Sequence, residues 1–188
     1  WREGRTGYPM IDACMRALKE TGWINFRMRA MLMSFSSYHL WLHWRRPALY
    51  LAKLFTDYEP GIHYSQAQMQ SGTTGINSIR IYNPTKQGVD HDPKGDFIRK
   101  WIPELRATSN ELIHNPATEH SKLHDYPCPI VDEKSARKTA AGKIFNLRRA
   151  SLHKEQAKKI FIKHGSRKST SIRRQKDRKT NDDQGELA

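Results

Sequence analysis

The sequence predicts an all-α fold followed by a basic, partly disordered tail. Apolar residues recur at spacings of three and four in the N-terminal third, which is typical of helices with one buried face. Prolines and glycines stand where such helices would begin and end. Lys and Arg are concentrated after residue 133, where apolar residues become scattered.

The first two predicted helices occupy residues 9–22 and about 25–44. In the first, Ile11, Met15 and Leu18 share one face, and the glycine at its end suits a helix C-terminus. In the second, one face carries Met28, Leu32, Phe35, His39 and Leu42.

The elements beyond residue 44 are predicted to be shorter. Residues 46–47, Arg-Pro, are expected to end the second helix, and residues 48–55 are compatible with another short one. Residues 57–78 are rich in Gly, Ser, Thr and Gln, which favours a binding loop, a short polar helix or a plain surface connection. Helical patterns return at residues 97–101 and 133–163.

The charge pattern divides the chain into three predicted parts. Residues 1–132 form a domain of nearly balanced charge, residues 133–163 a basic helical extension, and residues 164–188 a disordered basic tail. The stretch from residue 134 to the end holds 17 Lys/Arg against 5 Asp/Glu, so most of the net charge of +14 lies there. Either this stretch attracts a polyanion such as nucleic acid, or it is a solvated charged helix with a disordered tip.

Several classes of site and compartment are not favoured by the sequence. Cys14 and Cys128 are far apart and show no zinc-ligand spacing, so we expect no metal site and no disulfide framework. No apolar run approaches the roughly 20 residues that span a bilayer, and no secretory pattern is present. A cytoplasmic monomer is the expectation, and the opening Trp1 suggests a piece of a longer protein.

Four collinear blocks resemble the FAD-binding domain of the photolyase/cryptochrome family. They are residues 1–16, 22–44, 57–84 and 92–105, the last reading DPKGDFIRKWIPEL. The resemblance implies the C-terminal half of an all-α domain that holds FAD in a central cavity. It also implies chemistry in which excited reduced flavin donates an electron to a pyrimidine dimer in DNA, so no catalytic side chain is expected.

The resemblance assigns five residues to the cofactor. Arg29 matches the arginine beside the isoalloxazine ring, and Asp57 matches its acidic partner. Glu59 falls at the position that meets the pyrimidine edge of the flavin, His63 at the position facing flavin N5, and Asn25 one place before the family's asparagine. The alternative for the Arg29–Asp57 pair is a purely structural bridge between helix and loop.

Further positions match residues that contact DNA or carry electrons. Arg27 and Arg80 correspond to arginines that meet DNA phosphates, with ordinary exposed arginines as the alternative. Trp44 matches the middle member of the electron-transfer chain of tryptophans. The proximal member is missing, and Trp41 or Tyr64 is a candidate to replace it. The alternative for each of these aromatic residues is a packing role in the core.

The resulting functional prediction is light-driven repair of pyrimidine dimers by a longer, FAD-containing lyase that binds DNA. The family grips the FAD phosphates with a segment N-terminal to residue 1, so this chain alone is expected to be inactive. Two alternatives stay open. One is a cryptochrome-like blue-light photoreceptor without repair activity, and the other is a truncated product that binds nucleic acid without flavin.

Overall fold

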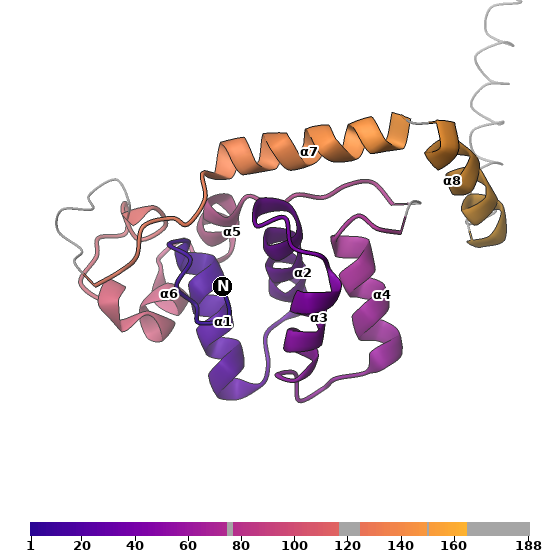
Figure 1. The fold of residues 1–188 in the computed structure, drawn as a ribbon. Helices are drawn as coiled ribbons and strands as arrows, with labels where there is room; N and C mark the ends of the chain where they lie inside the picture. Colours follow the sequence, from indigo (N-terminus) through magenta and orange to yellow (C-terminus); the bar gives the residue numbers. More distant parts are fainter. Residues whose placement is uncertain (75–76, 117–124, 150, 165–188) are drawn as a thin grey trace, which may run out of the picture. The chain divides into compact units, whose positions relative to one another are not determined.

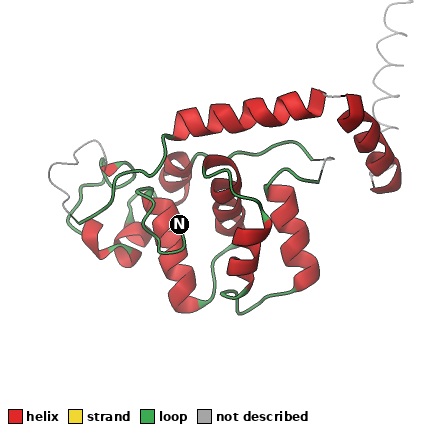
Figure 2. Cartoon of the chain, viewed as in Figure 1, coloured by secondary structure: helices red, strands yellow, loops and turns green. Residues whose placement is uncertain are grey.

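The regular elements of the described chain are all helices, which confirms the predicted all-α class (Figure 2). The computed structural model describes residues 1–74, 77–116, 125–149 and 151–164. The chain divides into two compact units, Trp1–Leu147 and Arg148–Ala188. No helix within the described ranges is both long and apolar enough to cross a bilayer.

Helix α1, Pro9–Thr21, is the central element of the first unit and packs against α2, α5 and α6 (Figure 1). Pro9 occupies its first turn, where a missing N–H is harmless. Gly22 ends it with φ 72°, and its N–H donates to the Leu18 carbonyl at 2.8 Å. The predicted apolar face of Ile11, Met15 and Leu18 is fully buried.

The second predicted helix, 25–44, is shorter than expected and changes type along its length. Helix α2 covers Phe26–Ser34, and a single π-helical turn, η1, covers Phe35–His39. The Leu40 N–H donates to the Phe35 carbonyl at 3.1 Å, the wider ring of a π turn. The helical conformation ends at His39, so His39 is buried with the rest of the predicted face, whereas Leu42 lies beyond the helix and is 40% exposed.

Prolines lie in the first turn of three further helices, of which one was among the predicted alternatives and two differ from the prediction. Pro47 does not end a helix but lies in the first turn of α3, Arg45–Ala52, where its missing N–H has no helical acceptor to lose. Residues 57–78 contain a true helix, α4, Pro60–Gln70. Helix α5, Pro84–His91, was not predicted, because an Asn-Pro pair is typical of turns; here Asn83 caps the helix and Pro84 occupies its first turn.

The rest of the first unit comprises α6, Asp96–Trp101, the 3₁₀ turn η2, Pro103–Leu105, and most of α7, Glu133–Arg149, whose last two residues fall in the second unit. The described part of the second unit also includes α8, Ser151–His164. Both helices fall in the segment 133–163 that was predicted to be helical, and the division at residues 132 and 163 stays a prediction. The predicted disorder of the tail concerns residues that, from 165 on, lie outside the described chain.

The segment before α1 is joined to the segment before α7 by what we call the terminal clasp, residues 6–8 with 126–131. The Ile130 N–H donates to the Thr6 carbonyl at 2.9 Å, and the Tyr8 hydroxyl donates to the Val131 carbonyl at 2.7 Å. Gly7 has φ 79°, and a Cβ there would lie 2.3 Å from the Cys128 carbonyl carbon. Only glycine therefore allows the two segments to approach so closely.

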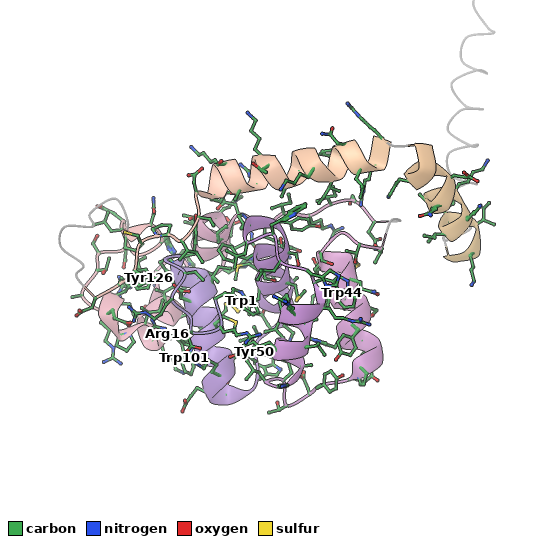
Figure 3. All side chains as sticks on the ribbon, viewed as in Figure 1. Trp1, Arg16, Trp44, Tyr50, Trp101 and Tyr126 are labelled. Carbon is green, nitrogen blue, oxygen red and sulfur yellow. The ribbon has the colours of Figure 1, made fainter. Side chains whose placement is uncertain are left out.

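Asp12 of α1 is the polar centre of this clasp. Its fully buried carboxylate accepts hydrogen bonds from the Thr6 amide and hydroxyl at 2.7 Å each, from the Gly7 amide at 3.0 Å and from the Tyr126 hydroxyl at 2.6 Å. Arg16, which lies one turn later and is labelled in Figure 3, forms a forked pair with Glu104 at 2.7 and 2.9 Å. Polar contacts from α1 thus reach both the clasp and η2.

Candidate functional site

A half-open cavity of about 160 Å³ lies where α4 packs against α2 and α3. Its apolar lining includes Phe26, Ala30, Met33, Leu51, Phe55 and Ile62. Its polar lining comprises Arg29, Asp57, Tyr58, Glu59, His63, Gln66 and Gln70. Four of the five residues predicted to contact a cofactor therefore line one cavity, although they come from two helices and the loop between α3 and α4.

Arg29 is held rigidly at the edge of this cavity. Its Nη2 donates to Asp57 Oδ2 at 2.9 Å, which confirms the predicted pairing of these two residues. Its Nε donates to the Ile24 carbonyl at 2.8 Å, and its guanidinium carbon lies 4.2 Å from the centre of the Phe55 ring. The hydrogen bond from Arg29 lowers the pKa of Asp57, so the pair stays ionised at neutral pH.

Asn25 and Glu59 each cap the N-terminus of a helix. Asn25 Oδ1 accepts from the Met28 N–H at 3.0 Å at the start of α2, and Asn25 is not among the residues that line the cavity. Glu59 Oε2 accepts from the Ile62 N–H at 2.7 Å at the start of α4 and does line it. Contact of either side chain with a cofactor stays a prediction.

His63 has one ring nitrogen committed to the backbone. Its Nε2 lies 2.8 Å from the Ala48 carbonyl, and because a carbonyl can only accept, Nε2 carries the hydrogen. In the neutral ring Nδ1 is then a hydrogen-bond acceptor. The rings of Phe55, Tyr58 and Tyr64 surround the imidazole, with centroids 5.8, 5.5 and 5.1 Å away.

Gln66 is a cavity residue that the sequence analysis did not single out. Its Oε1 is buried and has no hydrogen-bond partner among the described residues. A buried amide oxygen without a donor is unusual in a folded protein, so a donor from a ligand would be well accommodated here. Gln66 and Gln70 are four residues apart, a spacing that places both on one face once residues 60–70 are known to be helical.

The two tryptophans predicted to carry electrons occupy different environments, and neither lines the cavity. Trp44, at the start of α3, packs against the main apolar cluster (Figure 3). Trp41 is 48% exposed and has φ 51°, a left-handed conformation that is rare for a bulky residue. Lys143 of α7 lies 4.7 Å from the centre of the Trp41 ring.

The two arginines predicted to meet DNA phosphates are both exposed and lie outside the main cavity. Arg27 borders a very small pocket with Met10, Met28 and His91. Arg80 borders a pocket of about 70 Å³ together with Gln70, whose side chain also lines the main cavity. In the part of the chain that the structure describes, no group of three or more His, Cys, Asp or Glu residues is arranged to hold a metal ion.

Comparison with known proteins gives a consistent result. Residues 1–146 match the family model described as the FAD binding domain of DNA photolyase. The chain is 39% identical over 142 residues to the deoxyribodipyrimidine photo-lyase of Escherichia coli K12, covering 73% of this chain and 30% of that protein. It is 36% identical over 163 residues to cryptochrome-2 of Arabidopsis thaliana, covering 81% of this chain and 27% of that protein.

Solved structures show the same relationship. The archaeal photolyase from Sulfolobus tokodaii, solved with two FAD molecules, superimposes with a TM-score of 0.73 at 36% identity over 78% of this chain and 34% of that one. A class III photolyase from Agrobacterium tumefaciens gives 0.72 at 32% identity, covering 80% and 33%. The chain spans about a third of the length of these relatives. The helical fold, the cavity and these matches together show that the chain belongs to the photolyase/cryptochrome family, as part of its FAD-binding domain.

Proposed function

We propose that this chain supplies one side of the FAD site in a photolyase-type protein, a lyase that repairs pyrimidine dimers in DNA as part of a longer chain. The observation that supports this most directly is the Arg29–Asp57 ion pair at the edge of an apolar cavity. A flavin ring needs flat apolar contacts on its faces and hydrogen-bonding groups at its polar edge. The cavity offers both.

The size of the cavity agrees with a partial site. Complete ligand pockets commonly measure about 300–1,000 Å³, whereas this one measures about 160 Å³. The cavity therefore suits one part of the cofactor, with the remainder held by other segments of a longer protein. The unpartnered Gln66 oxygen and the acceptor nitrogen of His63 add two polar contacts that a flavin edge could meet.

When bound, FAD supplies light absorption and the electron that splits the dimer. In our proposal Arg29 places a fixed positive charge beside the ring, where it stabilises negative charge without reorganisation. Asp57 fixes the direction of that guanidinium and partly balances its charge. Glu59 sets the start of α4, so that His63 and Gln66 face the cavity one and two turns later.

The proposal extends to DNA and to electron supply. Arg27 and Arg80 are exposed and free to make forked contacts with phosphates. Trp44 would carry electrons through the core, whereas Trp41, named above as a substitute for the proximal member, lies at the surface and would serve at the outer end of the chain instead. Cys14 and Cys128 are not joined in a disulfide, in keeping with a cytoplasmic protein, which we propose is a monomer.

Titration with FAD tests the flavin proposal on the chain as it is. We expect quenching of flavin fluorescence that saturates with protein, and a loss of affinity of at least about tenfold in both Arg29→Ala and Asp57→Ala, because either change leaves the other charge unpaired. Arg45→Ala, which removes an arginine of α3 that does not line the cavity, is the matched control. Arg29→Ala and Asp57→Ala variants that bind FAD as tightly as Arg45→Ala would contradict the proposal.

A cryptochrome-like photoreceptor is the second candidate. It is favoured by the cavity lining, which in the described residues contains no tryptophan, and by the position of Asn25 outside that lining, because both depart from the family pattern. Blue-light illumination of dimer-containing DNA with the intact longer protein separates the two. Disappearance of dimers supports repair, and unchanged dimers with fully reduced flavin support signalling.

A further inference from the structure

A second, larger hollow lies on the first unit, apart from the flavin cavity. This groove of about 560 Å³ is lined by two isoleucines of the extended segment 79–82 and by one face of α7. Its lining comprises Ile79, Ile81, Lys134, Arg137, Lys138, Ala141 and Phe145. None of these residues lines the cavity that holds Arg29 and Asp57.

The extended segment presents its side chains alternately to two sides. Ile79 and Ile81 line the groove, whereas Arg80 between them borders the small pocket beside Gln70. Ser34 Oγ fixes this register, because it donates to the Arg80 carbonyl at 3.3 Å and accepts from the Tyr82 N–H at 3.2 Å. The apolar floor of the groove is thus held in place by α2.

Helix α7 supplies the opposite wall, which is basic and ends in an aromatic ring. Lys134, Lys138, Ala141 and Phe145 follow one another at spacings of four, three and four, so they share one face of the helix. The Phe145 side chain is 57% exposed. Of the described residues that line the groove, none is acidic, although Glu133 lies nearby and pairs with Arg137 at 3.1 Å.

A positively charged wall, an apolar floor and an exposed aromatic ring together match a single strand of nucleic acid. Its phosphates can meet the lysines while an unstacked base lies on the ring, as in grooves that bind single strands without sequence preference. A duplex keeps its bases stacked inside, so it could use the lysines but not Phe145. An acidic peptide would meet the same charges, but it offers a flat face to that ring only where it carries an aromatic side chain, whereas every nucleotide carries a base.

We infer that this groove binds single-stranded nucleic acid, with Lys134 and Lys138 on the backbone and Phe145 against a base. The inference is independent of the proposed flavin site. A chain that binds FAD but no single strand would overturn it and leave the flavin proposal intact. A chain that binds the single strand but not FAD would support this inference and count against the flavin proposal.

Fluorescence anisotropy with a labelled oligothymidylate of about 12 nucleotides tests the charged wall in the full 188-residue chain. We expect Lys138→Gln to weaken binding and to reduce the slope of log affinity against log salt by about 0.7, the value for one phosphate contact with a single strand. Lys143→Gln removes the same charge from the same helix, but at a side chain that lies over Trp41 and does not line the groove. Its salt slope should equal that of the wild type.

Phe145→Ala tests stacking. We expect affinity to fall about five- to hundredfold with the salt slope unchanged, which corresponds to the loss of one stacked base. Alanine is the better helix former, so α7 should persist. Phe161→Ala in α8, where the ring is 48% exposed, is the matched control and should bind as the wild type does.

Three results would overturn the inference. They are equal affinity for a duplex of the same length, equal losses in Phe145→Ala and Phe161→Ala, and equal salt slopes in Lys138→Gln and Lys143→Gln. The first would show a non-specific attraction of charges. The other two would place binding elsewhere on the chain.

Discussion

Asp12 shows how much of this fold depends on one buried acceptor. Its carboxylate receives donors from the segment before α1 and from Tyr126, more than a hundred residues away. Burial raises the pKa of Asp12, and the hydrogen bonds from Tyr126, Thr6 and Gly7 oppose that rise. Loss of the acceptor would leave several buried donors unsatisfied at once.

We therefore expect Asp12→Ala to lower the free energy of unfolding by at least about 3 kcal/mol, because each orphaned buried donor costs about 1–3 kcal/mol. Urea denaturation followed by circular dichroism measures this. Asp90→Ala is the control, since Asp90 pairs with Lys86 at the surface of α5, and its loss should change stability by less than about 1 kcal/mol. Equal effects of the two changes would contradict the role given to Asp12.

His39 is a second residue whose burial has a measurable consequence. It lies in the π turn, stacks on Phe35 with ring centroids 5.0 Å apart, and has a fully buried side chain. Burial lowers its pKa below 6.5, while Glu133, 3.7 Å away on α7, opposes the shift and Arg137 reinforces it. Because the unfolded chain takes up this proton more readily, the stability that neutral His39 contributes is lost as the pH falls below 6.5.

We expect the melting temperature to fall as the pH is lowered from about 7.5 to about 5.5. In this range the histidine of the unfolded chain, which has an ordinary pKa, takes up its proton while His39 of the folded chain resists protonation. His39→Leu should flatten this dependence because it removes the titrating group. His43→Leu, which alters an exposed histidine four residues later, should leave the dependence in place. A His39→Leu protein with an unchanged pH profile would rule out His39 as its source.

At the scale of elements, Asn25 at the N-terminus of α2 has two possible roles, as a helix cap and as a contact of the cofactor, and they can be tested separately. Asn25 caps this helix through Met28. Asn25→Ala should therefore destabilise the chain by about 1 kcal/mol, whereas Asn25→Ser should retain most of the stability because serine is a comparable cap. Thermal melts measure both variants.

The same pair of variants tests the predicted contact of Asn25 with the cofactor. If Asn25 only caps the helix, FAD affinity in Asn25→Ser should equal that of the wild type. A loss of FAD affinity in Asn25→Ser at unchanged stability would show that the amide itself contacts the flavin. Stability and FAD affinity, measured on the same variants, therefore distinguish the capping role of Asn25 from contact with the cofactor.

The sequence predicted some elements well for identifiable reasons. The burial of α1 follows from local spacing and a terminal glycine, and the Arg29–Asp57 pair followed from matching two family motifs that lie 28 residues apart. The π turn after Ser34 could not be predicted, because a one-residue expansion of a helix leaves no periodic signal in five residues. Helix α5 was missed because Asn-Pro suits a turn and a helix start equally well.

Some residues of the candidate site could be predicted from family motifs, whereas others depend on structure that the local sequence does not reveal. Arg29, Asp57, Glu59 and His63 belong to motifs, and the structure brings them to one cavity. Gln66 depends on the existence of α4, which polar composition alone did not establish. The environment of Trp41 depends on a left-handed backbone and on a lysine about a hundred residues later, and neither can be inferred from local sequence.

At the scale of the molecule, the two units should be separable. The first unit, Trp1–Leu147, holds both apolar clusters and the cavity lined by Arg29 and Asp57. A chain ending after Arg149, which keeps α7 whole, should unfold in urea with the same midpoint and the same slope as the full chain, since the slope reports the surface exposed on unfolding. A midpoint lowered in the shorter chain would show that the second unit stabilises the first.

The terminal clasp also has a kinetic consequence. Tyr8 and Val131 are 123 positions apart, so their hydrogen bond closes a very long loop. The conformational entropy of that loop must be given up before the hydrogen bond can form. Contacts of such separation are expected to form after the helices of α1, α5 and α6 have packed. Gly7→Ala should then accelerate unfolding while leaving the folding rate nearly unchanged, and stopped-flow measurements across a range of urea concentrations would show this. The terminal clasp would then be the last contact to form, and its strength would set the lifetime of the folded state.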